Sequence, residues 1–349
     1  MVWINRYVAA VSVVALTQAL LWGSHALAAD GPPVRQAPLQ LPEAPEAYRE
    51  ASLSGGPPKD GIPSIDSPKF HGARDAQGYL DDGDVVLGVV RDGTAKAYPR
   101  RILVWHEIVN DRLAGQPVSV SYCPLTGSAL GFLRGDTTLG VSGRLVNSNL
   151  IMYDRATDSA WPQMLGTAVS GPLAGRSLQS LQVTWTTWAR WRERYPDTRV
   201  LSTDTGHIRD YNRDPYGQYN PRRGGYYAPD AATMFPVMHK DGRFPPKTEF
   251  IVVHDGNGAV AFRLAALRDN GVLEGSTGGT RYTAVYDTGL DTGAVFRNPE
   301  AVDVTAGQVS FDTGGAVLSG DARSLERVVS YRAMWFAYAA FFPDGDVVE

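Results

Sequence analysis

Apolar and polar positions alternate along most of the chain, and this pattern predicts a protein built mainly from short β-strands. The clearest example is residues 85–99, where two alternating runs flank Asp92-Gly93, a dipeptide that favours a tight hairpin turn. Helical spacing is limited to short segments such as residues 184–195, which Pro196 ends because it cannot continue a helix. We therefore predict a β-rich α+β fold.

The chain also repeats part of its own pattern. Arg176–Val200 aligns without gaps to Arg323–Val347, and both segments place aromatic residues at the same helical positions. The matched pairs are Trp188 with Trp335, Trp191 with Tyr338, and Tyr195 with Phe342. Because these positions are three and four residues apart, we expect the rings to share one helix face and to pack in the core. The sequence thus predicts two tandem related repeat units.

The predicted organisation has several consecutive parts. They are a signal peptide at 1–28, a Pro-rich N-terminal arm at 29–60, a first repeat unit at 61–205, a connector at 206–247 and a second repeat unit at 248–349. The connector is long and rich in Tyr, Pro and Gly, and a loop of that length is either disordered or functional. Its tyrosines favour an ordered segment that packs over the repeats.

The first 28 residues have the features of an export signal. Arg6 precedes an apolar run that is shorter than a membrane span, and Ala26-Leu27-Ala28 has the small-x-small pattern of a cleavage site. We expect a periplasmic or secreted protein with no membrane span after signal cleavage. An uncleaved signal anchor is the alternative.

Charge and cysteine content narrow the function classes. The formal net charge is −4 and there is no block of basic residues, so nothing predicts binding to nucleic acid or to an anionic membrane. Cys123 is the only cysteine, which excludes an intrachain disulfide. After export an exposed thiol would be oxidised, so we expect Cys123 to be buried, bound to a metal or used chemically.

Five clustered motifs carry a resemblance to a known family. They are "GGPPKDGIPSIDSPKF", "VWHEIVND", "SYCPLTGSALGF", "NSNLIMYDRATDSAWPQ" and "GPLAGRSL". Together they resemble the bacterial family catalogued as domain of unknown function 3179, over roughly residues 53–349. The resemblance implies a fold unit that is often exported, and it implies no established activity. Some members that look similar carry a second cysteine three residues after the first, where this chain has Thr126, so a C-x-x-C metal or dithiol site does not apply here.

The two predicted units differ in their polar residues, which favours a single functional site on the first unit. Only the first unit has a cysteine, and a duplication that keeps its packing residues in both halves but its polar residues in one indicates one site. The candidate residues are His106, Glu107, Cys123, Asn147, Asn149, Tyr153 and Asp154. Alternation at 117–123 places Cys123 on the same strand face as two serines.

Three interpretations of Cys123 remain open at this point. It is an inert core cysteine, which is the commonest state of a free thiol. Alternatively it is a metal ligand with His106, in a site that suits copper or zinc. In the third interpretation it is a nucleophile, with His106 as base and Glu107 or Asp154 orienting the imidazole.

The remaining candidates complete the predicted site as ligand-binding residues. Asn147 and Asn149 point to one face of an extended segment, which suits binding of a substrate carbonyl or the support of a turn. Tyr153 and Asp154 follow on the same segment, and the match of Asp154 to Asp312 in the second unit favours a structural role for that aspartate.

The sequence leaves three hypotheses for function. The leading one is a periplasmic metal- or small-ligand-binding protein with one site near Cys123. The first alternative is a cysteine-dependent enzyme that acts on an acyl or similar electrophilic group. The second is a protein-interaction scaffold that uses the tryptophan helices and the connector.

Overall fold

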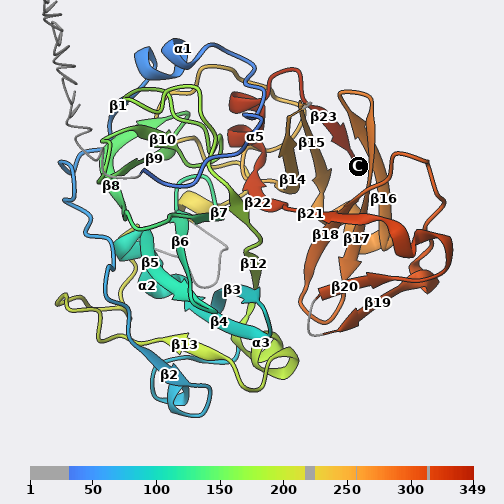
Figure 1. Ribbon diagram of the computed structural model, residues 1–349, viewed down its shortest axis with the longest axis horizontal. Helices are drawn as coiled ribbons and strands as arrows, with labels where there is room; N and C mark the ends of the chain where they lie inside the picture. The colour runs from blue at the N-terminus through green and yellow to red at the C-terminus, as the bar shows by residue number, and fades with distance from the viewer. Residues whose placement is uncertain (1–30, 217–224, 257, 313–314) are drawn as a thin grey trace, which may run out of the picture.

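A computed structural model of the protein describes residues 31–216, 225–256, 258–312 and 315–349. The fold is β-rich. The predicted signal peptide lies outside the described residues. Strands account for 39% and helices for 16% of the described residues, which confirms the β-rich prediction. In the described part, five sheets of four or five strands form a five-blade propeller-like arrangement, and a two-stranded hairpin is added at one side (Figure 1).

Three of the sheets come from residues 53–201. In spatial order, the first contains β1 (Leu53–Ser54), β8 (Leu139–Val146), β9 (Asn149–Asp154) and β10 (Ala160–Pro162). The second contains β11 (Ser180–Leu181), β7 (Ser128–Leu133), β6 (Gln116–Cys123) and β5 (Ile108–Leu113). The third contains β12 (Thr184–Thr187), β3 (Val85–Arg91), β4 (Thr94–Pro99), β13 (Arg199–Leu201) and β2 (Phe70–Gly72). Helices α2 (Arg100–His106) and α3 (Trp188–Arg194) and the 3₁₀ turn Asp75–Gly78 lie in this part, and α1 (Pro45–Glu50) precedes it.

The remaining sheets come from residues 249–348. One contains β22 (Tyr331–Met334), β14 (Glu249–Asp255), β15 (Gly258–Arg263) and β23 (Asp346–Val348). Another contains β16 (Val272–Thr277), β17 (Thr280–Asp287), β18 (Thr292–Arg297) and β21 (Glu326–Val328), and the hairpin is β19 (Val309–Asp312) with β20 (Gly315–Leu318). The helices are α4 (Leu264–Asn270) and α5 (Trp335–Phe341), with 3₁₀ turns at Ala306–Gln308 and Gly320–Ser324, and a further 3₁₀ turn, Gly225–Tyr227, lies in the connector.

The predicted hairpin at Asp92-Gly93 is confirmed. Strands β3 and β4 pair up to Arg91 and Thr94, and the two residues between them have φ angles of 46° and 73°. Two positive φ angles are the requirement of the type I′ turn, whose twist matches that of the flanking strands. The local sequence therefore sets this turn.

Two sheets from different halves of the chain have the same strand order. Strand β12 pairs antiparallel with β3 and β13 pairs parallel with β4, while β22 pairs antiparallel with β14 and β23 pairs parallel with β15. Trp188 and Trp335 begin the helices α3 and α5 that connect these strands, and both are fully buried. The aromatic faces of these helices therefore pack in the core as expected, whereas the tandem repeat itself stays a prediction.

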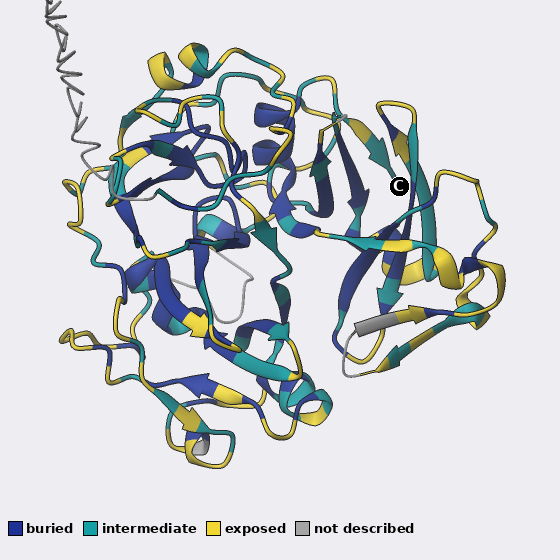
Figure 2. Cartoon of the chain, in the orientation of Figure 1, coloured by how far each residue is buried: buried dark blue, intermediate teal, exposed yellow. Residues whose placement is uncertain are grey.

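Helix α5 links the two halves through the core. Every residue of α5 is buried, and Figure 2 shows buried residues concentrated there and in the central strands. The largest apolar cluster includes Tyr122 and Trp161 from the first half together with Trp335 and Phe341 from α5. The backbone N–H of Met334 also donates to the carbonyl of Thr126, at 3.0 Å. The loop after β6 therefore lies against the end of β22, where α5 begins.

No helix in the described part of the chain has the length and apolar character needed to cross a bilayer.

Candidate functional site

Cys123 is the last residue of β6 and lies where two of the sequence motifs meet. Its side chain is 1% exposed. The Sγ atom accepts a hydrogen bond from the N–H of Leu150, at 3.4 Å, and donates to the carbonyl of Ser148, at 3.8 Å. The loop after β6 is thereby fixed against the turn between β8 and β9.

A fully buried polar network surrounds this contact. Its members are Ser121, Thr126, Ser128, Asn149 and Gln163, each with no exposed surface. The Asn149 amide donates to the Thr126 hydroxyl and to Gln163 Oε1, each at 3.0 Å, and Asn149 Oδ1 accepts the N–H of Met164 at 3.0 Å. Because every member has a partner, this network stabilises the loop without leaving polar groups unpaired. The predicted ligand-binding amide of Asn149 is thus engaged by the protein itself.

Asn147 holds the connector and α5 in place. Asn147 and Ser148 have φ angles of 53° and 59° and form the tight turn between β8 and β9. The Asn147 side chain accepts from the N–H of Met238 at 2.7 Å and donates to the carbonyl of Ala340 at 3.1 Å. In the described structure its amide therefore has protein partners at both ends.

The side chains of Tyr153 and Asp154 also have protein partners. Asp154 is fully buried and accepts bonds from the N–H of Thr157, at 2.6 Å, and from the Trp161 indole, at 3.0 Å. The Tyr153 hydroxyl donates to the carboxylate of Asp60. Asp154 thus supports a turn and a core tryptophan, which is the structural role expected from its match to Asp312 in the second half.

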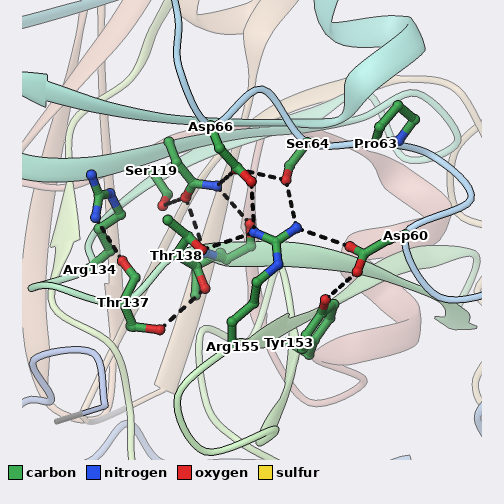
Figure 3. Close-up of polar contacts among 12 residues, drawn as sticks. Asp60, Pro63, Ser64, Asp66, Ser119, Arg134, Thr137, Thr138, Tyr153 and Arg155 are labelled. Carbon is green, nitrogen blue, oxygen red and sulfur yellow. Dashed lines mark hydrogen bonds and ion pairs between the residues drawn. The ribbon is translucent and has the colours of Figure 1, made fainter. Parts of the chain in front are cut away.

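Sequence reasoning missed an arginine-centred network that ties the loop 60–66 to this region. Arg155 bonds Asp60, Asp66 and Ser64, each at 3.1 Å, as Figure 3 shows. Asp66 in turn accepts from the Asn110 amide at 2.6 Å. The signal was present in the motifs "KDGIPSIDSP" and "YDRATD", whose charges pair with one another.

His106 is held by that loop and does not pair with Cys123. Its Nδ1 lies 2.8 Å from the carbonyl oxygen of Pro63, and its Nε2 lies 2.7 Å from the Tyr211 hydroxyl. Since a carbonyl only accepts, Nδ1 carries the proton and Nε2 accepts from tyrosine. Burial lowers the pKa of His106 to about 4, so the imidazole is neutral near pH 7.

The predicted thiol–imidazole pair is therefore not assembled. Both nitrogens of His106 are engaged elsewhere, and a base or metal-ligand role beside Cys123 would require one of these bonds to break. Within the described ranges there is also no group of three His, Cys, Asp or Glu side chains placed to hold a metal ion. Copper or zinc binding by Cys123 and His106 has no support in this geometry.

We expect His106→Gln to lower the free energy of unfolding by about 1–2 kcal/mol at pH 7, because buried hydrogen bonds are weakened. Between pH 6.5 and 4 the unfolded chain binds a proton that the folded His106 does not, so wild-type stability falls with decreasing pH and the variant lacks this contribution. Urea denaturation at pH 5 and 7 measures both effects, with the exposed His71→Gln as control. Alkylation of Cys123 by iodoacetamide should not slow in His106→Gln; a slower rate would restore histidine as its base.

Glu107 has the most unusual environment among the predicted site residues. It follows α2 with φ 55° and ψ −30°, and its N–H bonds the carbonyl of Leu103 at 2.7 Å. This left-handed position at a helix C-terminus is normally occupied by glycine. The side chain is 6% exposed, and desolvation by burial is the cause of its altered ionisation, with no hydrogen bond to a described residue contributing. Burial raises the pKa of Glu107 to about 8.

Glu107 lies beside Cys123 and affects its ionisation. The carbonyl of Glu107 accepts the N–H of Tyr122, at 2.7 Å, which brings the two segments side by side. Burial raises the pKa of the Cys123 thiol to about 11, and the nearby Glu107 carboxyl adds to this effect. Both shifts favour the protonated form, so near neutral pH they favour a neutral thiol beside a neutral carboxylic acid.

Tyrosines from the connector cover the loop after β6. The hydroxyl of Tyr226 donates to the carbonyl of Leu125 at 2.6 Å, and that of Tyr227 donates to the carbonyl of Pro124 at 3.0 Å. Burial raises the pKa of Tyr216, and the neighbouring Glu107 and Cys123 raise it further. The described part of the connector thus packs over the candidate site.

Lys247 is the last residue of the connector, and the sequence analysis did not name it as a candidate site residue. It is 6% exposed, and its amine lies 3.5 Å from the ring centroid of Tyr226 and 4.4 Å from that of Phe336. The amine has no hydrogen-bond partner in the described structure. Burial lowers the pKa of Lys247 to about 7.

The fold and the site define a class of β-rich, propeller-like protein with a buried thiol–carboxyl centre on its N-terminal half. The chain belongs to the family described as a protein of unknown function (DUF3179), whose model matches residues 59–345. No match to a curated protein or to a solved structure was found.

Proposed function

We propose that the protein is an exported small-ligand-binding protein with one site at Glu107 and Cys123. The observation that carries this proposal is Glu107 itself, a buried carboxyl with no hydrogen bond to a described residue, on a residue in the left-handed backbone region. A buried polar group without a hydrogen bond costs about 1–3 kcal/mol, and a non-glycine residue in this region costs a further 1–2 kcal/mol. Such costs cluster at functional sites, where a ligand supplies the missing partner. Export rests on the features of residues 1–28.

We further propose that the two halves are copies of one duplicated unit, and that only the first copy keeps the site. Gly271 occupies the position of Glu107, with φ 75° after α4, and its carbonyl likewise accepts the N–H of a tyrosine, Tyr286, at 2.8 Å. Asp287 occupies the position of Cys123 and is paired with Arg194 at 3.0 Å. The second copy has an unstrained glycine and a satisfied carboxylate where the first copy has a strained acid with no hydrogen bond to a described residue.

A binding role fits this centre better than thiol catalysis. A nucleophilic cysteine needs a substantial thiolate fraction, whereas burial holds the pKa of Cys123 at about 11. A neutral Glu107 both donates and accepts hydrogen bonds, which suits a ligand that carries a carbonyl, hydroxyl or carboxylate group. The carboxyl group is therefore the expected recognition element.

A thermal-shift screen of small acids, amides and alcohols with the full chain tests this function. A ligand at a hundred times its dissociation constant adds about 2.7 kcal/mol of stability, which corresponds to a rise of roughly 5 °C in melting temperature. We expect at least one chemical class to raise the melting temperature of the wild type but not of Glu107→Leu. Glu193→Gln, an exposed acid on α3, is the matched control. Equal shifts in Glu107→Leu and wild type would contradict the proposed site.

A further inference from the structure

A surface pocket of about 480 Å³ lies where the start of the connector packs over α2. Its apolar wall is formed by Val104 and Trp105 of α2, by Ile62 of the preceding loop and by Pro215 of the connector. Ile208 also lines the pocket and is 98% exposed, so its side chain adds apolar surface that a ligand can cover. The volume falls in the range of pockets that hold small organic molecules. The wall therefore suits a small molecule with an apolar side group.

The lining of this pocket carries one charge of each sign. Arg209 and Asp210 are neighbours in the chain, and both line the pocket. The Arg209 guanidinium lies 5.9 Å from the ring centroid of Trp105 and donates to the carbonyl of Ile208 at 2.9 Å. One carboxylate oxygen of Asp210 accepts the N–H of Asn212 at 3.1 Å. Among the described residues neither group forms an ion pair, so most donors of the guanidinium and the second carboxylate oxygen are available to a ligand.

Another arginine over a tryptophan shows the alternative in which the protein pairs its own charges. The guanidinium of Arg243 lies 5.0 Å from the ring centroid of Trp335, and its Nε lies 2.7 Å from the carboxylate of Asp241. The same three residue types meet at the pocket, but there the acid and the base do not pair with each other. This difference favours a ligand-binding role for Arg209 and Asp210.

We propose that this pocket binds a free amino acid with a large apolar side chain, whose carboxylate pairs with Arg209, whose ammonium group pairs with Asp210 and whose side chain lies against Trp105. The two charges select a zwitterion, because a ligand with a single charge leaves one of the two groups without a partner. The planar guanidinium suits the carboxylate, to which it can donate two parallel hydrogen bonds. The inference goes beyond the proposed function, because it assigns a second site that does not depend on Glu107.

Isothermal titration of the full chain with phenylalanine, phenethylamine and 3-phenylpropanoate tests the proposal. The three molecules share an apolar body, but phenethylamine lacks the carboxylate and 3-phenylpropanoate lacks the ammonium group. We expect phenylalanine to bind about tenfold more tightly than either, which corresponds to about 1.4 kcal/mol for each lost ion pair. If phenylalanine does not bind at millimolar concentration, or if the three affinities are equal, the inference is wrong.

Two charge-removing variants assign each end of the ligand. Arg209→Gln should weaken phenylalanine binding about tenfold and leave phenethylamine binding at least as tight as in the wild type. Asp210→Asn should weaken phenylalanine binding by a similar factor and leave 3-phenylpropanoate binding at least as tight. Arg243→Gln is the matched control and should leave the affinity for phenylalanine unchanged. Equal losses for all three molecules in a variant would show that its residue supports the fold of the pocket, and would overturn its role in recognition.

Glu107→Leu distinguishes this pocket from the proposed site. It should leave phenylalanine binding unchanged, whereas a ligand found in the thermal-shift screen should depend on Glu107 and not on Arg209. Failure of phenylalanine to bind would therefore leave the proposed function standing. Phenylalanine binding that is lost in Glu107→Leu as well as in Arg209→Gln would overturn the assignment of a second, separate site.

Discussion

Glu107→Gly is expected to stabilise the folded protein by on the order of 4 kcal/mol at pH 9, and to abolish ligand binding. The folded carboxyl group has its pKa raised from 4.5 to about 8. Between these values the folded chain holds a proton that the unfolded chain has released, so wild-type stability falls as pH rises through this window. Each pKa unit corresponds to about 1.4 kcal/mol. Glycine removes this penalty and the backbone strain at φ 55° together, while the space left by the side chain offsets part of the gain.

Urea denaturation of wild type and Glu107→Gly at pH 5, 7 and 9 measures this effect. The gap between the two free energies of unfolding should widen from pH 5 to pH 9. Glu107→Gln separates the causes, because it keeps the strained backbone and the side-chain volume but cannot ionise; its free energy of unfolding should differ from that of Glu107→Gly by the same amount at all three pH values. Curves that run parallel for wild type and Glu107→Gly would show that the carboxyl group is not desolvated.

If Glu107→Gly raises the free energy of unfolding, the glutamate at this position is retained for function and not for stability. Natural proteins retain destabilising residues where activity needs them, and consensus-like replacements there raise stability at the expense of function. Gly271 shows that the same local backbone is available with glycine in the other half of the chain. The retention of glutamate at 107 therefore argues for selection on binding rather than on folding.

The sequence predicted local features of the fold well, because local chemistry decides them. The turn at Asp92-Gly93 depends on two residues that accept positive φ, and the aromatic face of α3 depends on helical spacing alone. The propeller-like arrangement was not predicted, because strands such as β1 and β8 are paired across about ninety residues of chain. Alternation identifies a strand but does not identify its partner.

The sequence named both Cys123 and Glu107 as candidate residues, but it did not predict how the surrounding side chains pair. Cys123 and Glu107 lie together because β5 and β6 are neighbouring strands of one hairpin. The sequence analysis paired His106 with the thiol because His106 lies on the element that precedes the cysteine strand. Its ring nitrogens instead contact Pro63 and Tyr211, which are 43 and 105 residues away in the chain. Which way a side chain points at a helix end depends on such distant partners, which no single sequence displays.

Lys247→Met is expected to raise the free energy of unfolding by several kcal/mol at pH 6. The folded amine has its pKa lowered from 10.5 to about 7 by burial. Between these values the unfolded chain binds a proton that the folded chain does not, so wild-type stability rises from pH 7 to about pH 10.5, and below pH 7 the penalty is complete. At about 1.4 kcal/mol per pKa unit the penalty is on the order of 4 kcal/mol. Methionine has a similar length and packs well against the rings of Tyr226 and Phe336.

Urea denaturation at pH 6, 8.5 and 10 distinguishes this effect from that of Glu107, whose contribution changes only below about pH 8. The advantage of Lys247→Met should shrink as pH rises, and the exposed Lys240→Met should show no such trend. If Lys247→Met is instead less stable than wild type at pH 6, the attraction of the ammonium to its two aromatic rings outweighs its desolvation. Tyr226 contacts both Lys247 and the loop after Cys123. The sign of the stability difference therefore shows whether the charged amine stabilises or destabilises the packing of the connector over the site.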